Sequence, residues 1–126
     1  MHIVTRDEIG VARLPGRAIQ TAVGKDGHSA SGGMTVGFGR YSAESGPMEP
    51  HRHAEEVIYV IDAAHAWTRF GPERDALGER VPLRPGMILH NPPQEWHVYG
   101  YDEGGFADLL FIYGQVDDIR PEEAAR

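Results

Sequence analysis

The residues best suited to chemistry lie in the segment HRHAEE, which begins at His51. His51 and His53 are two positions apart, so their side chains point to the same side of an extended strand. Two carboxylates, Glu55 and Glu56, follow directly. Imidazoles and carboxylates are donors for divalent transition metals, and such a site needs a further ligand from elsewhere in the chain. His97 is the candidate for that ligand.

Alternation along the strand leaves open which glutamate would complete the site. Glu55 continues the odd-numbered phase of His51 and His53, and an uninterrupted strand therefore favours it. Glu56 reaches the same side only if a bulge or turn shifts the phase by one residue.

The composition predicts a soluble, mostly β domain. The chain has 126 residues, which fits a single domain over 1–126. Hydrophobic residues make up 40% and charged residues 25%, as in ordinary globular domains. Its 16 glycines and 9 prolines are spread along the sequence, which indicates many tight turns between short elements.

The charge balance argues against several partners. The net charge is −7, from 19 acidic and 12 basic side chains, which disfavours nucleic acids and anionic membranes. Cysteine is absent, so any metal must rest on His, Asp and Glu. No stretch has the apolar length of a membrane span or a leader peptide, and we therefore expect a cytoplasmic protein.

Alternating apolar residues predict short strands and no long helix. Turn signals every eight to twelve residues favour a β-sandwich or barrel. The expected strands cover residues 17–23, 34–41, 57–61, 65–70, 87–90, 96–101 and 106–113.

The two histidine-containing segments resemble the two motifs of the cupin superfamily, over roughly residues 34–113. The first motif is represented by Gly46, His51, His53, Glu56 and, in place of a closing glycine, Ala63. The second is represented by Gly86, Pro92, Gln94 at a glycine position, His97, and Tyr101 where asparagine is common. The resemblance implies an all-β, single-domain cupin-type β-barrel, that is, a double-stranded β-helix or jelly roll.

The resemblance also implies a metal centre and an enzyme. The cupin turn selects Glu56, so the implied ligands are His51, His53, Glu56 and His97, holding one Fe(II), Mn(II), Ni(II), Co(II) or Zn(II) ion. The substrate would be a small oxygen-rich organic molecule. Dioxygenase-type oxidoreductase chemistry is favoured because this ligand set commonly holds Fe(II) in the family. The alternatives are a metal-dependent isomerase, lyase or cyclase, and a non-catalytic cupin that binds or senses a small molecule.

Further residues are candidates for contacts with the substrate. His90 and Tyr99 are candidate catalytic residues, His90 as a general base or a substrate donor and Tyr99 through its hydroxyl. Arg40 is a candidate anion binder, unless a register shift of one residue places it on the surface. The remaining substrate-binding candidates are Trp67, Arg69 and Tyr101.

The ends of the chain have no obvious place in a minimal barrel. Small cupins often pair, which leads us to expect a homodimer, with residues 1–33 supplying a strand to the partner. Residues 114–126 form an acidic tail.

Overall fold

A computed structural model describes residues 1–114, and its regular elements are strands apart from two short 3-10 helices. The acidic tail predicted from residue 114 onward lies, apart from Gly114 itself, outside the described residues. The all-β prediction is confirmed. The elements are the short 3-10 helices η1 (Arg6–Glu8) and η2 (Ala43–Ser45) and the strands β1 (Ala12–Leu14), β2 (Arg17–Val23), β3 (Thr35–Ser42), β4 (Glu56–Gly71), β5 (Val81–Pro82), β6 (Ile88–Asn91) and β7 (Trp96–Tyr113).

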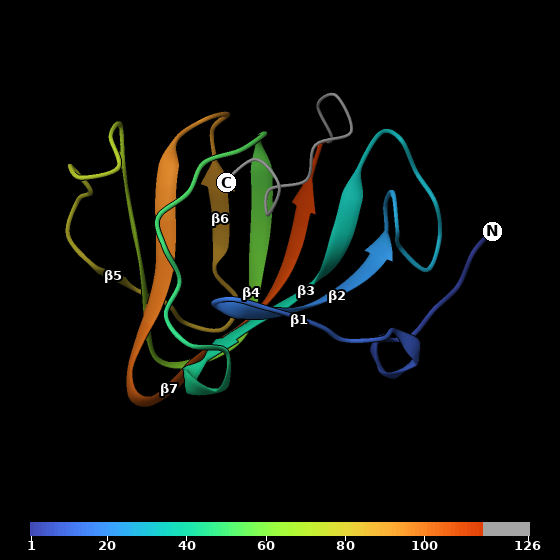
Figure 1. The fold of residues 1–126 in the computed structure, drawn as a ribbon, viewed down its shortest axis with the longest axis horizontal. Coiled ribbons are helices and arrows are strands. Elements are labelled where there is room, and N and C mark those ends of the chain that lie inside the picture. Colours follow the sequence, from blue (N-terminus) through green and yellow to red (C-terminus); the bar gives the residue numbers. More distant parts are fainter. Residues whose placement is uncertain (115–126) are drawn as a thin grey trace.

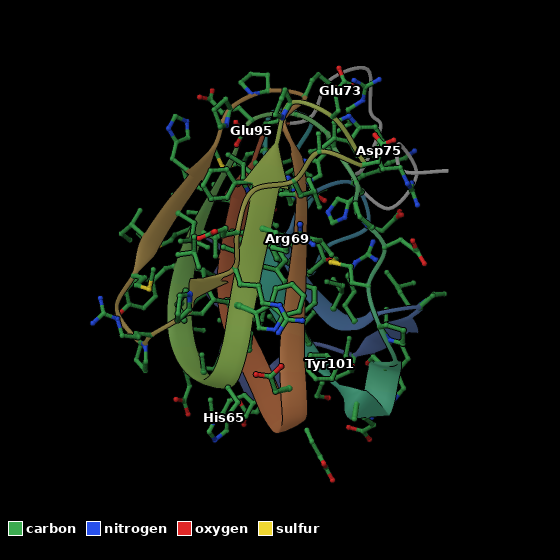
Figure 2. All side chains as sticks on the ribbon, turned by 90° about the vertical axis from the view of Figure 1, so that its left-hand side faces the viewer. His65, Arg69, Glu73, Asp75, Glu95 and Tyr101 are labelled. Carbon is green, nitrogen blue, oxygen red and sulfur yellow. The ribbon has the colours of Figure 1, made fainter. Side chains whose placement is uncertain are left out.

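The strands form one antiparallel sheet in the order β1-β2-β3-β7-β4-β5, and β6 also pairs with β4. Strands β4 and β7 run side by side along their whole lengths. Their register shifts between Val60 and Asp62 and again between Ala64 and Ala66. Bulges of this kind bend a strand and increase its twist. Both strands accordingly turn near His65 at the bottom of the view, and their halves fold toward each other (Figures 1 and 2).

The bend explains two differences from the sequence prediction. Residues 57–61 and 65–70 were expected as separate strands, and so were 96–101 and 106–113; each pair belongs to one bent strand. Residues 102–105, between the two expected strands, are extra unpaired length within β7, where Gly104 adopts a φ of 78°. Glycine takes up such a left-handed conformation without the steric cost of a Cβ.

The inner faces of the folded sheet bury the core. Alternate residues of β4 and β7 are almost fully buried, among them Ile58, Val60 and Leu109. In β3 the odd-numbered residues, from Thr35 to Tyr41, face inward, and the even-numbered ones face outward. Glycine is required at one of these inward positions, because a Cβ on Gly37 would lie 2.8 Å from the ring of Phe111.

The N-terminal segment has a place in the sheet of its own chain. Strands β1 and β2 extend the edge beyond β3. The guanidinium of Arg6 donates two hydrogen bonds to Asp108, at 2.7 and 2.6 Å, and stacks over Phe38. Residues 1–23 are thus accommodated without a partner chain. No helix among residues 1–114 has the length and apolar character needed to cross a membrane.

Candidate metal centre

Three histidines meet at the end of the barrel opposite the bend. His51 and His97 are paired through their backbones, each donating its N–H to the other's carbonyl, at 3.0 and 2.9 Å. This pairing brings their rings to 4.5 Å between centroids, and the His53 ring lies 4.8 Å from that of His97. All three are buried, and the nitrogens they offer lie within 4.8 Å of one another. This three-histidine group has the geometry to hold a metal ion.

The backbone fixes which nitrogen each histidine offers. Each Nδ1 faces a carbonyl oxygen, which can only accept, so each Nδ1 carries the hydrogen and each Nε2 keeps a free lone pair. Metal-ligating histidines are oriented in this way. The Nδ1 contacts are from His51 to Glu49 O at 3.2 Å, from His53 to Ala54 O at 2.7 Å and from His97 to Glu95 O at 3.1 Å.

One of these nitrogens is an unsatisfied buried atom that a bound cation would suit. His97 Nε2 is buried and has no hydrogen-bond partner among the described residues. A buried polar atom without a partner costs free energy, and a bound cation would satisfy this one. The residues present therefore fit a metal.

Glu56 brings a carboxylate to the same point. Its Oε1 lies 3.5 Å from His53 Nε2 and 3.8 Å from His97 Nε2, and its side chain is buried. Glu55 points the other way, to the surface, where its carboxylate meets His90 Nε2 at 2.7 Å. The shift in phase that Glu56 requires is therefore present just before β4.

Burial controls the protonation of these groups. Burial, together with a smaller contribution from repulsion between the imidazoles, lowers the pKa of His51 to about 4 and of His97 to about 2. Neutral imidazole is the form that binds metals. Burial also raises the pKa of Glu56 to about 7, while a hydrogen bond from Asn91 works in the opposite direction.

Asn91 links the carboxylate to a buried tyrosine. Its Nδ2 donates to Glu56 Oε1 at 3.1 Å and to the Tyr99 hydroxyl oxygen at 3.3 Å. Burial raises the pKa of Tyr99 well above its usual value, so the hydroxyl keeps its proton. Tyr99 also packs near the three-histidine group, with its ring 5.9 Å from that of His97.

A cavity of about 30 Å³ opens beside the histidines. Its walls come from strands on both sides of the folded sheet. Besides His51, His53 and Glu56, it is lined by Arg17, Ile19, Tyr41, Tyr99, Phe111 and Tyr113. Of the residues predicted to contact the substrate, Tyr99 lines this cavity.

The other candidates lie elsewhere, and their positions give no support to the roles expected of them. Arg40 is exposed on the outer face of β3, with its guanidinium 4.5 Å from the Phe106 ring centroid. His90 is bonded to Glu55 at the surface. Both sit on the outward-facing phase of their strands.

The last three candidates have structural contacts. Trp67 packs flat against Gly100, where a Cβ would lie 2.2 Å from the indole, and is covered by Arg80 at 4.2 Å. Arg69 donates to the carbonyls of Leu77 and Gly78 and so holds the loop after β4.

Tyr101 ties the loop before His51 to the barrel. Its hydroxyl donates to Gly46 O at 2.9 Å. Gln94, which stands at a glycine position of the second motif, adopts the left-handed conformation itself, with a φ of 65°. Ala63 instead lies inside β4, and the left-handed residue nearby is His65, with a φ of 50°.

Sequence reasoning did not identify Arg17, Tyr41, Asn91 and Tyr113 as parts of the site. Asn91 carried a signal, because it is adjacent to the candidate His90 and has the opposite phase. Arg17 lies outside both motif segments, and nothing in its local sequence marks it.

Solved structures share this fold. The polyketide cyclase RemF from Streptomyces resistomycificus aligns with a TM-score of 0.67 and 20% identity, covering 90% of this chain and 79% of that one. A protein from Planctomyces limnophilus aligns with a TM-score of 0.70 and 20% identity, covering 93% and 91%. A DMSP lyase chain, from the structures of RdDddP and RnDddQII, aligns with a TM-score of 0.62 and 22% identity over 95% of this chain and 58% of that one.

These likenesses establish the architecture. The chain has the cupin fold, and its three-histidine group lies in the barrel. No protein-family profile matches the sequence. No curated protein matches it either.

Proposed function

We propose that this protein is a metal-dependent enzyme acting on a small, oxygen-rich organic molecule. The observation that carries the proposal is the group of three buried histidines whose Nδ1 atoms all face carbonyls. The buried Glu56 carboxylate lies beside two of them, at 3.5 Å from His53 Nε2 and 3.8 Å from His97 Nε2. His51, His53, Glu56 and His97 would hold one divalent ion. Fe(II), Mn(II), Ni(II), Co(II) and Zn(II) all suit this donor set.

When bound, the ion would polarise oxygen atoms of a ligand as a Lewis acid. The chain's own contribution is proton handling at Tyr99. Because Asn91 Nδ2 donates to the Tyr99 oxygen, the hydroxyl hydrogen is free to point elsewhere, and Tyr99 lines the cavity. Tyr99 is therefore placed to donate a hydrogen bond or a proton to a ligand held beside Glu56.

This placement favours a lyase, isomerase or cyclase type of reaction, in which a proton is moved without an external oxidant. The names of two similar structures, a polyketide cyclase and DMSP lyases, are in keeping with this class. The dioxygenase chemistry implied by the ligand set is the alternative.

Metal content and turnover test the proposal. Protein made without a histidine tag should bind about one metal ion per chain by elemental analysis. A metal content below about a tenth of an ion per chain, after reconstitution with each of the five ions in turn, would exclude the site. Incubation with diols, catechols and keto acids, with and without oxygen, separates the reaction classes. Oxygen-independent conversion supports the first class, and oxygen uptake coupled to product supports the dioxygenase.

The role of Tyr99 has a matched control. Tyr99→Phe removes the hydroxyl and should lower kcat by about 10²-fold or more, with metal content unchanged. Tyr59→Phe makes the same change on the outer face, where Tyr59 is 42% exposed, and should leave kcat unchanged. Equal activity of both variants would remove Tyr99 from the reaction. Binding of a substrate panel without turnover would favour the sensing function.

We also propose a homodimer, a single domain and a cytoplasmic location. For the dimer, the outer face of β4, β6 and β7 offers adjacent exposed apolar side chains, namely Val57, Tyr59, Ile61, Ile88 and Ile112. A second copy would cover this face by stacking sheet on sheet. Sedimentation should show a dimer that Ile88→Glu dissociates, whereas removal of residues 1–10 leaves it intact; a monomeric parent protein would refute it.

A further inference from the structure

Several cations of the described chain, including Arg17, Arg40 and Arg69, form no ion pair, but of these Arg17 lines the cavity beside the histidines. Arg6, Arg13, Arg74 and Arg80 each face a carboxylate. The guanidinium of Arg17 has one hydrogen bond among residues 1–114, to Pro15 O at 3.3 Å, and forms no ion pair there. A guanidinium has five N–H donors, so most of its capacity is unused.

The sheet register turns this unused cation toward the metal-binding group. Ala18 lies opposite Arg40 and Ile19 opposite Gly39, so Arg17 and Ile19 share the inner face while Arg40 lies outside. Arg17 is half-buried and lines the cavity together with His51, His53 and Glu56.

The turn that carries Arg17 is fixed in place. The Gly16 N–H donates to Ser45 O at 2.9 Å, and Gly16 has a φ of 86°. A Cβ on Gly16 would lie 3.0 Å from the backbone of Met48. This close packing attaches the start of β2 to the loop that leads to His51, so the backbone of Arg17 is held beside the segment that carries the histidines.

The charges in the cavity favour an anion. The histidines are neutral, Glu56 contributes −1, a divalent ion +2 and Arg17 +1, so the loaded site carries a net +2. Uncompensated charge in a buried site is costly, and a ligand bearing one or two negative charges would offset it.

We propose that Arg17 binds the acid group of an anionic substrate, which makes the substrate class a compact carboxylic acid whose neighbouring oxygens face the histidines. A guanidinium matches a carboxylate in two parallel hydrogen bonds, which fixes orientation as well as charge. The cavity volume of about 30 Å³ limits the acid to a few non-hydrogen atoms unless side chains move. The inference depends on the proposed function only for the part of the ligand that faces the metal.

Titration calorimetry with formate and malonate tests it, with formamide and malonamide as neutral counterparts, on both the metal-free and the zinc-loaded protein. Wild type should bind at least one acid and neither amide. Arg17→Met should weaken that binding by at least about tenfold, and Arg17→Lys, which keeps the charge but loses the fork, should fall between. Arg13→Met, at an arginine with a 65% exposed side chain, should behave as wild type.

The outcomes separate this inference from the proposed function. If zinc binds but Arg17→Met retains wild-type affinity for the acids, the anion site is wrong and the metal centre stands. If zinc does not bind, the metal centre fails, and the metal-free titrations still decide on Arg17. Wild-type protein that binds neither acid in either state would overturn the inference. A normal circular dichroism spectrum of Arg17→Met shows that any loss is not caused by unfolding.

Discussion

Replacing Asn91 by leucine should weaken metal binding by about 10- to 100-fold. The Asn91 amide donates to Glu56 Oε1 at 3.1 Å in a buried setting. A hydrogen bond to a charged group contributes about 1.5–3 kcal/mol, and each 1.4 kcal/mol is about tenfold in affinity. The bond matters most with metal bound, when Glu56 must be ionised. In the metal-free protein, the raised pKa of about 7 lets Glu56 take up a proton instead.

The neighbouring residue provides the control. His90 is adjacent in β6 and also bonds a glutamate, but its partner is the exposed Glu55, and its own side chain is 58% exposed. His90→Ala should change zinc affinity by less than about twofold, as for other surface substitutions. Competition against a chromophoric zinc chelator at pH 7.5 measures the zinc affinity of both variants and of the parent protein.

Two results would contradict this reasoning. If Asn91→Leu binds zinc as tightly as wild type, the Asn91 contact does not support the carboxylate. If His90→Ala loses as much affinity as Asn91→Leu, the relevant glutamate is Glu55, and the geometry around Glu56 is incorrect. Urea denaturation of the metal-free variants distinguishes these outcomes from a general loss of folding.

Three further predictions concern the ligands, the pH response and the packing. His97→Ala should lower zinc affinity by roughly 100-fold or more, about a quarter of a typical structural zinc free energy, measured by the same competition. The free energy of unfolding of the metal-free protein should fall by at least about 1 kcal/mol per pH unit between pH 6.5 and 4.5. In this range the unfolded chain takes up protons at His51 and His97 that the folded chain excludes, and Glu56 offsets one of these two protons by binding a proton in the folded chain. A flat urea-denaturation profile in EDTA would contradict this prediction. Gly100→Ala should destabilise the fold by about 1–3 kcal/mol, because its methyl group would overlap the Trp67 ring, and unchanged thermal unfolding would refute this.

The sequence identified the histidines because local spacing determines their geometry. His51 and His53 share a phase on any extended segment, and this holds wherever the segment lies in the fold. The spacing alone could not decide whether Glu55 or Glu56 joins the histidines. The choice of Glu56 came from the turn that the cupin resemblance implies. The structure places the buried Glu56 beside the histidines.

The residues that sequence reasoning missed depend on pairing between distant strands. Arg17 and Arg40 both lie on alternating strands, and each was equally able to face the cavity. The register that sets Ala18 against Arg40 decides the matter, and it sends Arg40 outward. The same holds in β6, where Asn91 pairs with Glu56 and His90 with Val57, so the amide faces the site and the imidazole faces solvent.

The histidines and Glu56 meet because β4 and β7 are bent. Glu56 begins β4, and Phe70, near its end, is paired with His97. These positions are 70 − 56 = 14 residues apart, so a straight strand would separate them by roughly 46 Å. In the structure, Glu56 Oε1 lies 3.8 Å from His97 Nε2. The bulges between Val60 and Ala66, the part of β4 most distant from the cavity, are therefore as necessary to the site as the ligands themselves.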